Sequence, residues 1–209
     1  MTDFNTMTEK LVTCDAEGLL LIVQTALDEG VAAQDILTKG LIAGMDVVGE
    51  KMENGDMFIP EVLMAAHAMG KCVTMLKPLL AEGEATDGVS VIIGTVKGDL
   101  HDIGKNLVAM MLESSGMTVH DLGVDISPED FVAKITETNA KIVCISALLT
   151  TTMPMMKRTV DAIRESGLRD KVKIMVGGAP VTQTFADEIG ADGYAPDAGS
   201  ASKLAKSYA

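Results

Sequence analysis

Residues 89–104 read VSVIIGTVKGDLHDIG, an apolar run followed by a short polar turn. The unbroken run over 89–96 is rich in β-branched residues and predicts a strand buried on both faces, as in a parallel sheet. The turn after it places His101 two residues beyond Asp99 and just before Asp102. Ligands of open α/β sheets bind at the carboxyl ends of the strands. We therefore expect a candidate site here, with His101 as a metal ligand whose ring is oriented by a neighbouring carboxylate.

Further along the chain, strand-like segments alternate with amphipathic helical ones. We expect strands at 118–122, 141–147, 171–176 and 193–195. We expect helices at 106–113, 128–137, 153–166, 181–188 and 198–207. This alternation is typical of βαβ units and predicts a Rossmann-like, doubly wound parallel sheet of five strands over residues 89–209.

The first part of the chain has a helical hydrophobic period instead. Apolar residues recur three or four positions apart, which predicts helices within 6–14, 19–30, 37–52 and 62–80. Short connections between such helices favour an antiparallel helical bundle, which we assign to residues 1–85. The polar, glycine-containing stretch over 83–88 has the composition of a linker and is the expected hinge between the two domains.

Charge and composition exclude some classes of partner. The formal net charge is −13, whereas a nucleic-acid-binding protein needs a basic face for the phosphates. No apolar run approaches the length of a membrane span, and the N-terminus lacks the pattern of a signal peptide. The three cysteines are dispersed along the chain, which is typical of free thiols in a reducing compartment. We expect a cytoplasmic protein that binds neither nucleic acid nor membrane.

Three further strand ends carry unusual residues, and a parallel sheet brings all of them to the edge where His101 lies. The segment over 146–152 reads SALLTTT and is rich in hydroxyl groups, which offer hydrogen bonds without charge. Residues 177–180 read GGAP, and 193–197 read GYAPD. Glycines at strand ends allow a bulky ligand to approach the bare backbone.

These residues resemble a known signature. The Asp-x-His-x-x-Gly turn at 99–104, the Ser-x-Leu segment at 146–148 and the Gly-Gly pair at 177–178 resemble the cobalamin-binding domain. Residues 53–66, which read ENGDMFIPEVLMAA, resemble the cap domain of the same family. The order of the two domains is similar to that of the small corrinoid proteins of methyltransferase systems. It is also similar to the two middle modules of cobalamin-dependent methionine synthase.

The resemblance implies roles for the residues of the histidine turn. His101 would be the lower axial ligand of cobalt, in place of the corrinoid's own nucleotide base. Asp99 would accept the other imidazole N–H, and the Thr152 hydroxyl would extend this relay. Gly104 would leave room for the displaced nucleotide tail to enter the sheet.

The resemblance also implies a set of residues that contact the rest of the cofactor. Those expected on the cobalamin-binding domain are Ser146, Leu148, Thr150, Gly177 and Gly178. On the cap, Phe58 would cover the upper face of the corrin, with Val62 nearby. Lys97 and Lys105 flank the site, and we expect both to be solvated rather than bound to the cofactor.

The implied function is that of a methyl carrier. Reduced cobalt would accept a methyl group from a donor and give it to a second acceptor, while the protein orients and protects the cofactor. The expected partners are a substrate-specific methyltransferase, a methyl-acceptor methyltransferase and a reductive activase. Methylamine-type donors are favoured over methanol, betaines and methoxylated aromatics.

Two alternatives stay open at this point. A cobalamin-based sensor would use the same cofactor as a switch. A receiver- or flavodoxin-like signalling domain would instead use Asp99 or Asp102 to accept phosphate or to hold magnesium. The latter reading leaves the N-terminal helical bundle unexplained.

Overall fold

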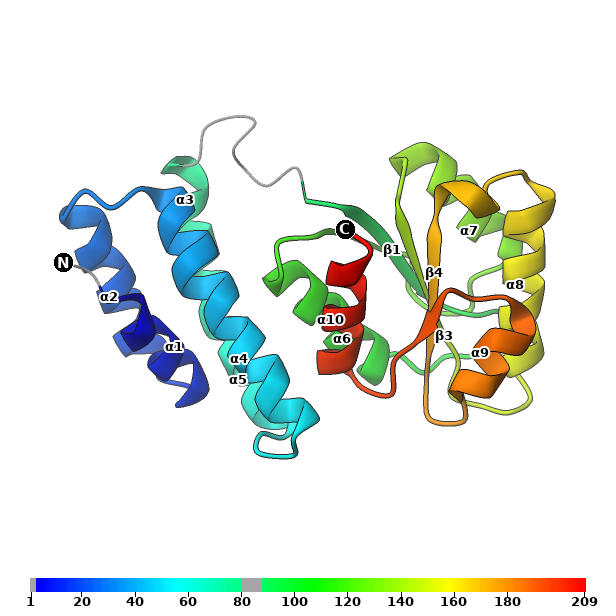
Figure 1. Cartoon of the computed structure of the whole chain (residues 1–209), viewed down its shortest axis with the longest axis horizontal. Helices are drawn as coiled ribbons and strands as arrows, with labels where there is room; N and C mark the ends of the chain where they lie inside the picture. Colours follow the sequence, from blue (N-terminus) through cyan, green and yellow to red (C-terminus); the bar gives the residue numbers. More distant parts are fainter. Residues whose placement is uncertain (1–2, 80–87) are drawn as a thin grey trace. The chain divides into compact units, whose positions relative to one another are not determined.

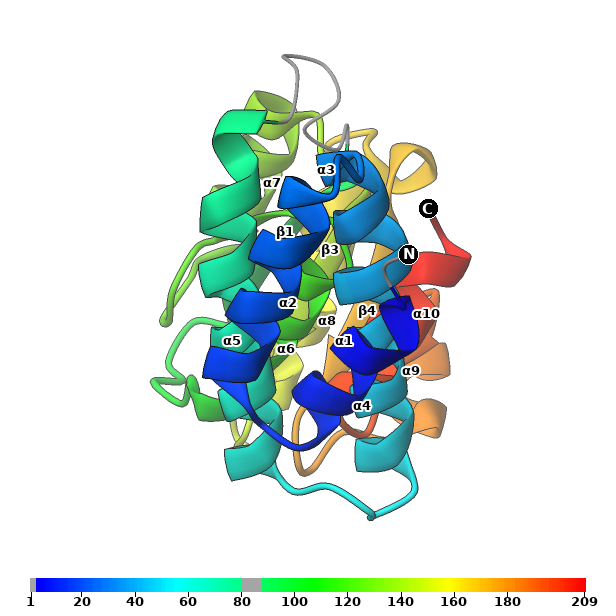
Figure 2. The ribbon, with the colours of Figure 1, turned by 90° about the vertical axis from the view of Figure 1, so that its left-hand side faces the viewer.

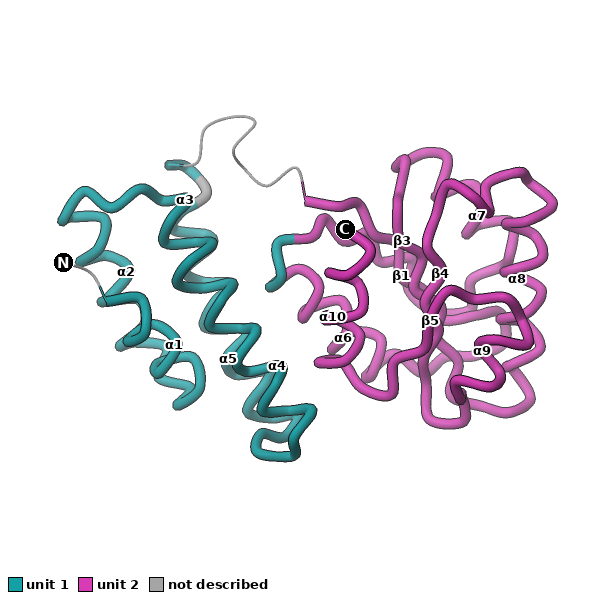
Figure 3. Tube along the Cα trace, in the orientation of Figure 1, with its two compact units in different colours: residues 1–87, 114–116 teal, residues 88–113, 117–209 magenta. Residues whose placement is uncertain are grey.

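The computed structural model describes residues 3–79 and 88–209. It divides the chain into two compact units, shown in different colours in Figure 3. Unit 1 comprises Met1–Asp87 together with Ser114–Gly116, and unit 2 comprises Gly88–Glu113 and Met117–Ala209. Residues 83–87 of the expected hinge, and the last residue of the helix expected over 62–80, lie outside the described residues.

Unit 1 is helical. In chain order its elements are α1 (Phe4–Val12), α2 (Ala16–Asp28), α3 (Ala33–Asp35), the π-helical η1 (Ile36–Ile42), α4 (Ala43–Glu53), α5 (Ile59–Leu76) and the 3₁₀ helix η2 (Lys77–Leu79). Figures 1 and 2 show α1, α2, α4 and α5 running alongside one another, and their side chains enclose an apolar core. The carboxylates of Asp3 and Asp15 accept N–H groups at the starts of α1 and α2. Such caps explain why these helices begin where they do.

The sequence predicts one helix over 37–52, whereas the structure places a π-helical segment, η1, before α4. Two buried glycines spaced four residues apart, Gly40 and Gly44, allow α1 to lie close to this segment. A Cβ on Gly40 would overlap the sulfur of Met7, and one on Gly44 would lie 2.6 Å from a methyl carbon of Leu11. Larger residues at these two positions would require the side chains of Met7 and Leu11 on α1 to shift.

Unit 2 is a five-stranded parallel sheet with strand order β2-β1-β3-β4-β5. The strands are β1 (Ser90–Thr95), β2 (Thr118–Asp121), β3 (Ile142–Ser146), β4 (Lys173–Gly177) and β5 (Gly193–Tyr194). The helices are α6 (Ile103–Ser114), α7 (Pro128–Thr138), α8 (Met153–Glu165), the 3₁₀ helix η3 (Arg169–Lys171), α9 (Gln183–Ile189) and α10 (Ala198–Ser207). The doubly wound, all-parallel fold predicted from the sequence is confirmed.

Alternate residues of each strand face opposite sides of the sheet. Ile92 and Val143 pack in one apolar cluster with residues of α7, α8 and α9. Val91 and Ile142 pack in a second cluster with residues of α6 and α10. Both faces are therefore covered by helices, which agrees with the continuous apolar runs of these strands.

The strand register decides which segments meet at the candidate site. Thr95 at the end of β1 is paired with Ser146 of β3, and Ser146 is paired with Gly177 of β4. The histidine turn and the segments that follow β3 and β4 therefore begin at the same edge of the sheet. Among the described residues, no helix has both the length and the apolar character needed to cross a membrane.

Candidate functional site

Asp99 is the centre of the hydrogen-bond network at this edge. Its side chain is fully buried, and its Oδ1 lies 2.7 Å from Nδ1 of His101. The same oxygen accepts the backbone N–H of His101 at 3.1 Å. Oδ2 accepts the Thr152 hydroxyl at 2.7 Å and the backbone N–H groups of Leu148 at 2.8 Å and Leu149 at 3.3 Å. One carboxylate thus joins the turn after β1 to the loop after β3.

These contacts fix the charge of Asp99. Burial on its own would raise the pKa of this carboxyl, but the hydrogen bonds from Thr152, Leu148 and His101 outweigh it and hold the pKa well below the usual range. Asp99 is therefore an anion at neutral pH. Because an anionic carboxylate can only accept a hydrogen bond, the single N–H of a neutral His101 ring is assigned to Nδ1.

This tautomer leaves the lone pair of His101 on Nε2. The side chain is 50% exposed, in contrast to the fully buried Asp99 that holds it. A neutral imidazole whose other nitrogen donates to a carboxylate is the form in which histidine ligates metals. The turn therefore presents one oriented nitrogen ligand at the sheet edge.

A residue of β1 fixes the backbone at His101 by a hydrogen bond. The buried hydroxyl of Thr95 donates to the carbonyl oxygen of His101 at 2.9 Å. Gly98 has a φ of 81°, in the left-handed region that favours glycine. The tight turn between Thr95 and His101 therefore depends on a glycine at this point.

The glycines expected to make room for a ligand differ in their surroundings. Nothing lies within 4 Å of the position that a Cβ on Gly104 would occupy. A Cβ on Gly177 would lie 3.1 Å from the carbonyl oxygen of Ala195, and one on Gly178 would overlap the carbonyl oxygen of Ala147. Gly104 leaves open space at the start of α6, whereas Gly178 is also required by the packing of the protein itself.

The other residues expected at the site lie on different elements. Ser146 is partly buried at the end of β3, and Leu148 and Thr150 are exposed in the loop that follows. In unit 1, Phe58 precedes α5 and is 67% exposed, whereas Val62 on α5 is buried.

Sequence reasoning missed two apolar side chains beside His101. Leu100 is 72% exposed and Ile103 is 78% exposed, although both residues are strongly hydrophobic. The signal was present, because each is an apolar residue within a polar turn. The backbone N–H of Leu149, which reaches Asp99, was missed for another reason, since backbone donors carry no residue-type signal.

The expectation that Lys105 is solvated is wrong. Its side chain is buried, forms an ion pair with Asp121 at the end of β2, and donates to Oδ1 of Asn106 at 2.7 Å. The first turns of α6 face the end of β2, so a lysine here lies against an available carboxylate. Lys97, by contrast, is exposed and lies 3.2 Å from Asp125.

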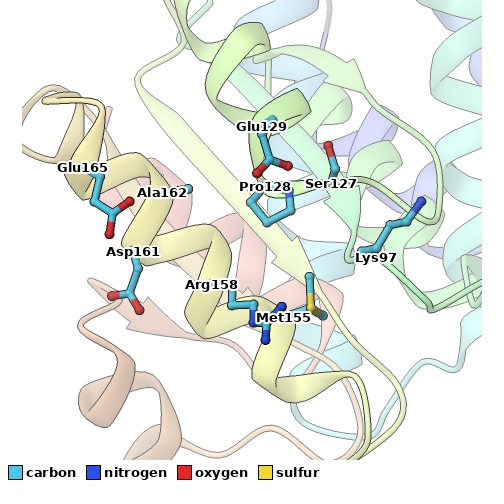
Figure 4. A pocket seen from close by; sticks show the side chains of 9 residues that line it. All are labelled: Lys97, Ser127, Pro128, Glu129, Met155, Arg158, Asp161, Ala162 and Glu165. Atoms are coloured by element: carbon cyan, nitrogen blue, oxygen red, sulfur yellow. The ribbon is translucent and has the colours of Figure 1, made fainter.

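Figure 4 shows a surface pocket of unit 2 between the start of α7 and helix α8. Its lining combines the cationic Lys97 and Arg158 with acidic residues that include Glu129 and Glu165. None of the residues expected at the site lines it. Within residues 3–79 and 88–209, no group of three or more His, Cys, Asp or Glu side chains is arranged to hold a metal ion.

Comparison with known protein families matches both parts of the chain. A family model described as a B12 binding domain matches residues 89–202. A second model with the same description matches residues 4–77. The two matches fall on the parallel sheet and on the helical part of the chain.

Similar proteins match along nearly the whole length. The dimethylamine corrinoid protein of Methanosarcina barkeri is 46% identical over 201 residues, which cover 96% of this chain and 94% of that protein. The crystal structure of a cobalamin-binding protein from Desulfitobacterium hafniense DCB-2 superposes with a TM-score of 0.88 at 32% identity and covers 100% of both chains. A methanol:cobalamin methyltransferase complex from Methanosarcina barkeri contains a chain with a TM-score of 0.82 and 30% identity, over 96% of this chain and 77% of that one.

Proposed function

We propose a function from the premise that this chain belongs to the family of B12-binding corrinoid proteins of methyltransferase systems. In this proposal, the chain carries methyl groups between two partner enzymes. The chain binds a corrinoid, as its two B12-binding matches indicate. This decides against the receiver-like alternative with a phosphate or magnesium site. The observation that carries the proposal is the buried Asp99 carboxylate, which holds the His101 ring by Nδ1.

The residues at the sheet edge fit a corrinoid. His101 would ligate cobalt through Nε2, since Asp99 occupies the other ring nitrogen. The open space at Gly104 would accept the displaced nucleotide tail. Ser146, Gly177 and Gly178 would lie along its path, with Leu148 and Thr150 beside it. When bound, the corrinoid supplies a cobalt centre that accepts a methyl group from one enzyme and gives it to another.

The protein's own contribution is to hold a proton and a charge in place. Asp99 keeps the imidazole proton on Nδ1, which makes the opposite nitrogen a better electron donor. The Thr152 hydroxyl and the Leu148 N–H stabilise the negative charge that Asp99 carries. Phe58, exposed at the start of α5, would shield the upper face of the cofactor from water.

Dimethylamine is the proposed methyl donor. The dimethylamine corrinoid protein of Methanosarcina barkeri is 46% identical to this chain, whereas the similar chain in the methanol:cobalamin methyltransferase complex is 30% identical. We infer three partners: a dimethylamine-specific methyltransferase that loads the carrier, a methyltransferase that passes the methyl group to an acceptor, and a reductive activase that restores oxidised cobalt.

The cofactor assignment is tested by reconstitution with hydroxocobalamin, followed by desalting and visible spectroscopy. Wild-type protein should retain the corrinoid, and His101→Ala should show a changed axial ligation or weaker retention. His67→Ala is the matched control, because His67 is an exposed histidine on α5 and lies outside the expected site. Wild-type protein that releases all corrinoid on desalting would contradict the proposal.

The donor is tested by loading the reduced, corrinoid-bound protein with purified methyltransferases specific for dimethylamine, monomethylamine or methanol. We expect the dimethylamine enzyme to methylate the carrier fastest, as followed by the change in visible absorption. Adding a second methyltransferase with a thiol acceptor should then reverse this change. Faster loading by the methanol enzyme would overturn the donor assignment while leaving the carrier function intact.

A further inference from the structure

The loop that carries His101 depends on contacts from neighbouring segments. Residues 97–102 form neither helix nor strand, so no regular hydrogen-bond ladder fixes their backbone. Within the loop, the Asp99 N–H donates to the carbonyl oxygen of Val96 at 3.1 Å. From outside, Thr95 holds the carbonyl of His101. Three further contacts from outside come from one residue, Asp125, in the connection between β2 and α7.

Asp125 contacts the histidine loop at three consecutive residues, Lys97, Gly98 and Asp99. Its Oδ1 accepts the backbone N–H of Gly98 at 2.8 Å. Its own N–H donates to the carbonyl oxygen of Asp99 at 3.0 Å. Its Oδ2 also lies 3.2 Å from Nζ of Lys97. Asp125 thus fixes the backbone on both sides of the Gly98–Asp99 peptide bond. The carboxylate of Asp99 in turn holds the His101 ring.

The backbone conformation of Asp125 suits this arrangement. Its φ of 57° lies in the left-handed region, where most side chains are strained but aspartate, asparagine and glycine are tolerated. In this conformation its N–H and its carboxylate both reach the histidine loop. The bridge Val96↔Ile126 joins the same two segments one residue further along. The contact is therefore part of a continuous junction between the two loops.

We propose that Asp125 is a positioning residue that holds His101 in the orientation needed to ligate cobalt. This inference rests on the proposed function and extends it to a residue outside the Asp-x-His-x-x-Gly turn. Without the carboxylate, the Gly98 N–H loses its acceptor and the loop samples more conformations. His101 then occupies the ligating orientation for a smaller fraction of the time. The apparent equilibrium constant for its ligation to cobalt falls in proportion to that fraction.

The test uses full-length protein labelled with ¹⁵N-histidine, loaded with hydroxocobalamin and reduced to the paramagnetic Co(II) state. The superhyperfine splitting in its electron paramagnetic resonance spectrum reports a histidine nitrogen on cobalt, and isotopic labelling separates it from the corrinoid's own base. The variant Asp125→Gly removes the carboxylate and tolerates the left-handed backbone. We expect the ratio of histidine-bound to histidine-free cobalt to fall on the order of tenfold, as for the loss of one charged hydrogen bond.

Two further variants separate positioning from charge. Asp125→Asn keeps an acceptor for the Gly98 N–H and should restore most of the histidine-bound form. Glu129→Gln removes one exposed negative charge from the first turn of α7 and should match wild type. If Asp125→Gly fails to fold, Asp125→Asn becomes the test variant, because its neutral amide oxygen accepts the Gly98 N–H more weakly than a carboxylate and should lower the histidine-bound fraction by a smaller amount.

The outcomes distinguish this inference from the function on which it rests. Wild-type protein that shows no histidine splitting refutes His101 as the ligand, and the inference falls with it. If wild type shows the splitting and folded Asp125→Gly shows the same ratio, the inference alone is overturned. An equal loss in Glu129→Gln would also overturn it, since the effect would then be one of general charge.

Discussion

The Thr152 hydroxyl lies 2.7 Å from Oδ2 of Asp99, although the two residues are 53 positions apart in the sequence. Thr152 is the N-cap residue of α8, where a threonine side chain ordinarily caps its own helix. Here the side chain makes no capping hydrogen bond. Its oxygen lies 2.7 Å from Asp99 and 2.9 Å from the carbonyl of Leu149, and the single hydroxyl proton serves one acceptor at a time. The first turn of α8 is therefore used to stabilise a buried charge on another element.

Replacing Thr152 by valine tests this link. The change keeps the shape of the side chain but removes the donor, which leaves a buried carboxylate with one hydrogen bond fewer. We expect the free energy of unfolding of the corrinoid-free protein to fall by about 1–3 kcal/mol, measured by urea denaturation. Thr152→Ser should retain most of the stability, and Thr151→Val, at an exposed position, should have little effect. Equal losses for Thr152→Val and Thr151→Val would show that the hydroxyl does not stabilise Asp99.

The general fold could be predicted from the sequence because its signals are local. The apolar run that forms β1 and the helical period of the later segments each depend on neighbouring residues in the chain. The π-helical segment η1 gave no such signal, because residues 37–52 carry the same helical hydrophobic period that an uninterrupted α-helix would show. Hydrophobic period therefore does not distinguish the two kinds of helix here.

The candidate site was predictable in part for the same reason. His101 and Asp99 are two residues apart, so their contact follows from the motif. Other contacts of the site come from segments far along the chain. These are the backbone N–H groups of the loop after β3, which donate to Asp99, and the Asp125 carboxylate, which accepts the Gly98 N–H. Lys105 was misjudged because its burial depends on Asp121, whose position is decided by the pairing of β2 with β1.

Gly104→Ala separates folding from cofactor binding. A Cβ at this position meets open space, and alanine is the better helix former in the first turn of α6. The corrinoid-free variant should be as stable as wild type or more stable by up to about 1 kcal/mol. If the nucleotide tail passes this point, the added methyl group should weaken the binding of hydroxocobalamin, as measured by titration. Unchanged corrinoid affinity would argue against a tail that runs beside Gly104.

Gly178→Ala has the opposite expectation. A Cβ here would overlap the carbonyl oxygen of Ala147, and the φ of 126° is one that alanine rarely adopts. We expect the corrinoid-free protein to lose more than about 3 kcal/mol of stability or to fail to fold, measured by thermal or urea unfolding. Gly167→Ala is a useful comparison, because it combines a positive φ with open space and tests backbone strain alone. Similar losses in the two variants would assign the effect at Gly178 to backbone strain rather than to the overlap.

Asp192 should make folding stability depend on pH. Burial opposes ionisation of this carboxyl, but the Ile174 N–H at 2.8 Å and the Arg169 guanidinium at 2.9 Å lower its pKa below the usual value. Because the folded-state pKa lies below that of the unfolded chain, about 3.9, ionised Asp192 stabilises the fold above that pH. The contribution is lost as the pH falls through the folded-state pKa.

The measurement is the free energy of unfolding of wild type and Asp192→Asn as a function of pH. Asparagine retains an acceptor for the Ile174 N–H but carries no charge toward Arg169, so the variant should be less stable by about 1–2 kcal/mol at pH 7. The gap should narrow below about pH 4 and close at lower pH, because protonated Asp192 is also neutral. Asp187→Asn serves as the control, because Asp187 is exposed and its side chain is bonded to Gln183. A gap of constant size from pH 7 down to complete protonation would show that Asp192 stabilises the protein through its shape and hydrogen bonds, and not through its charge.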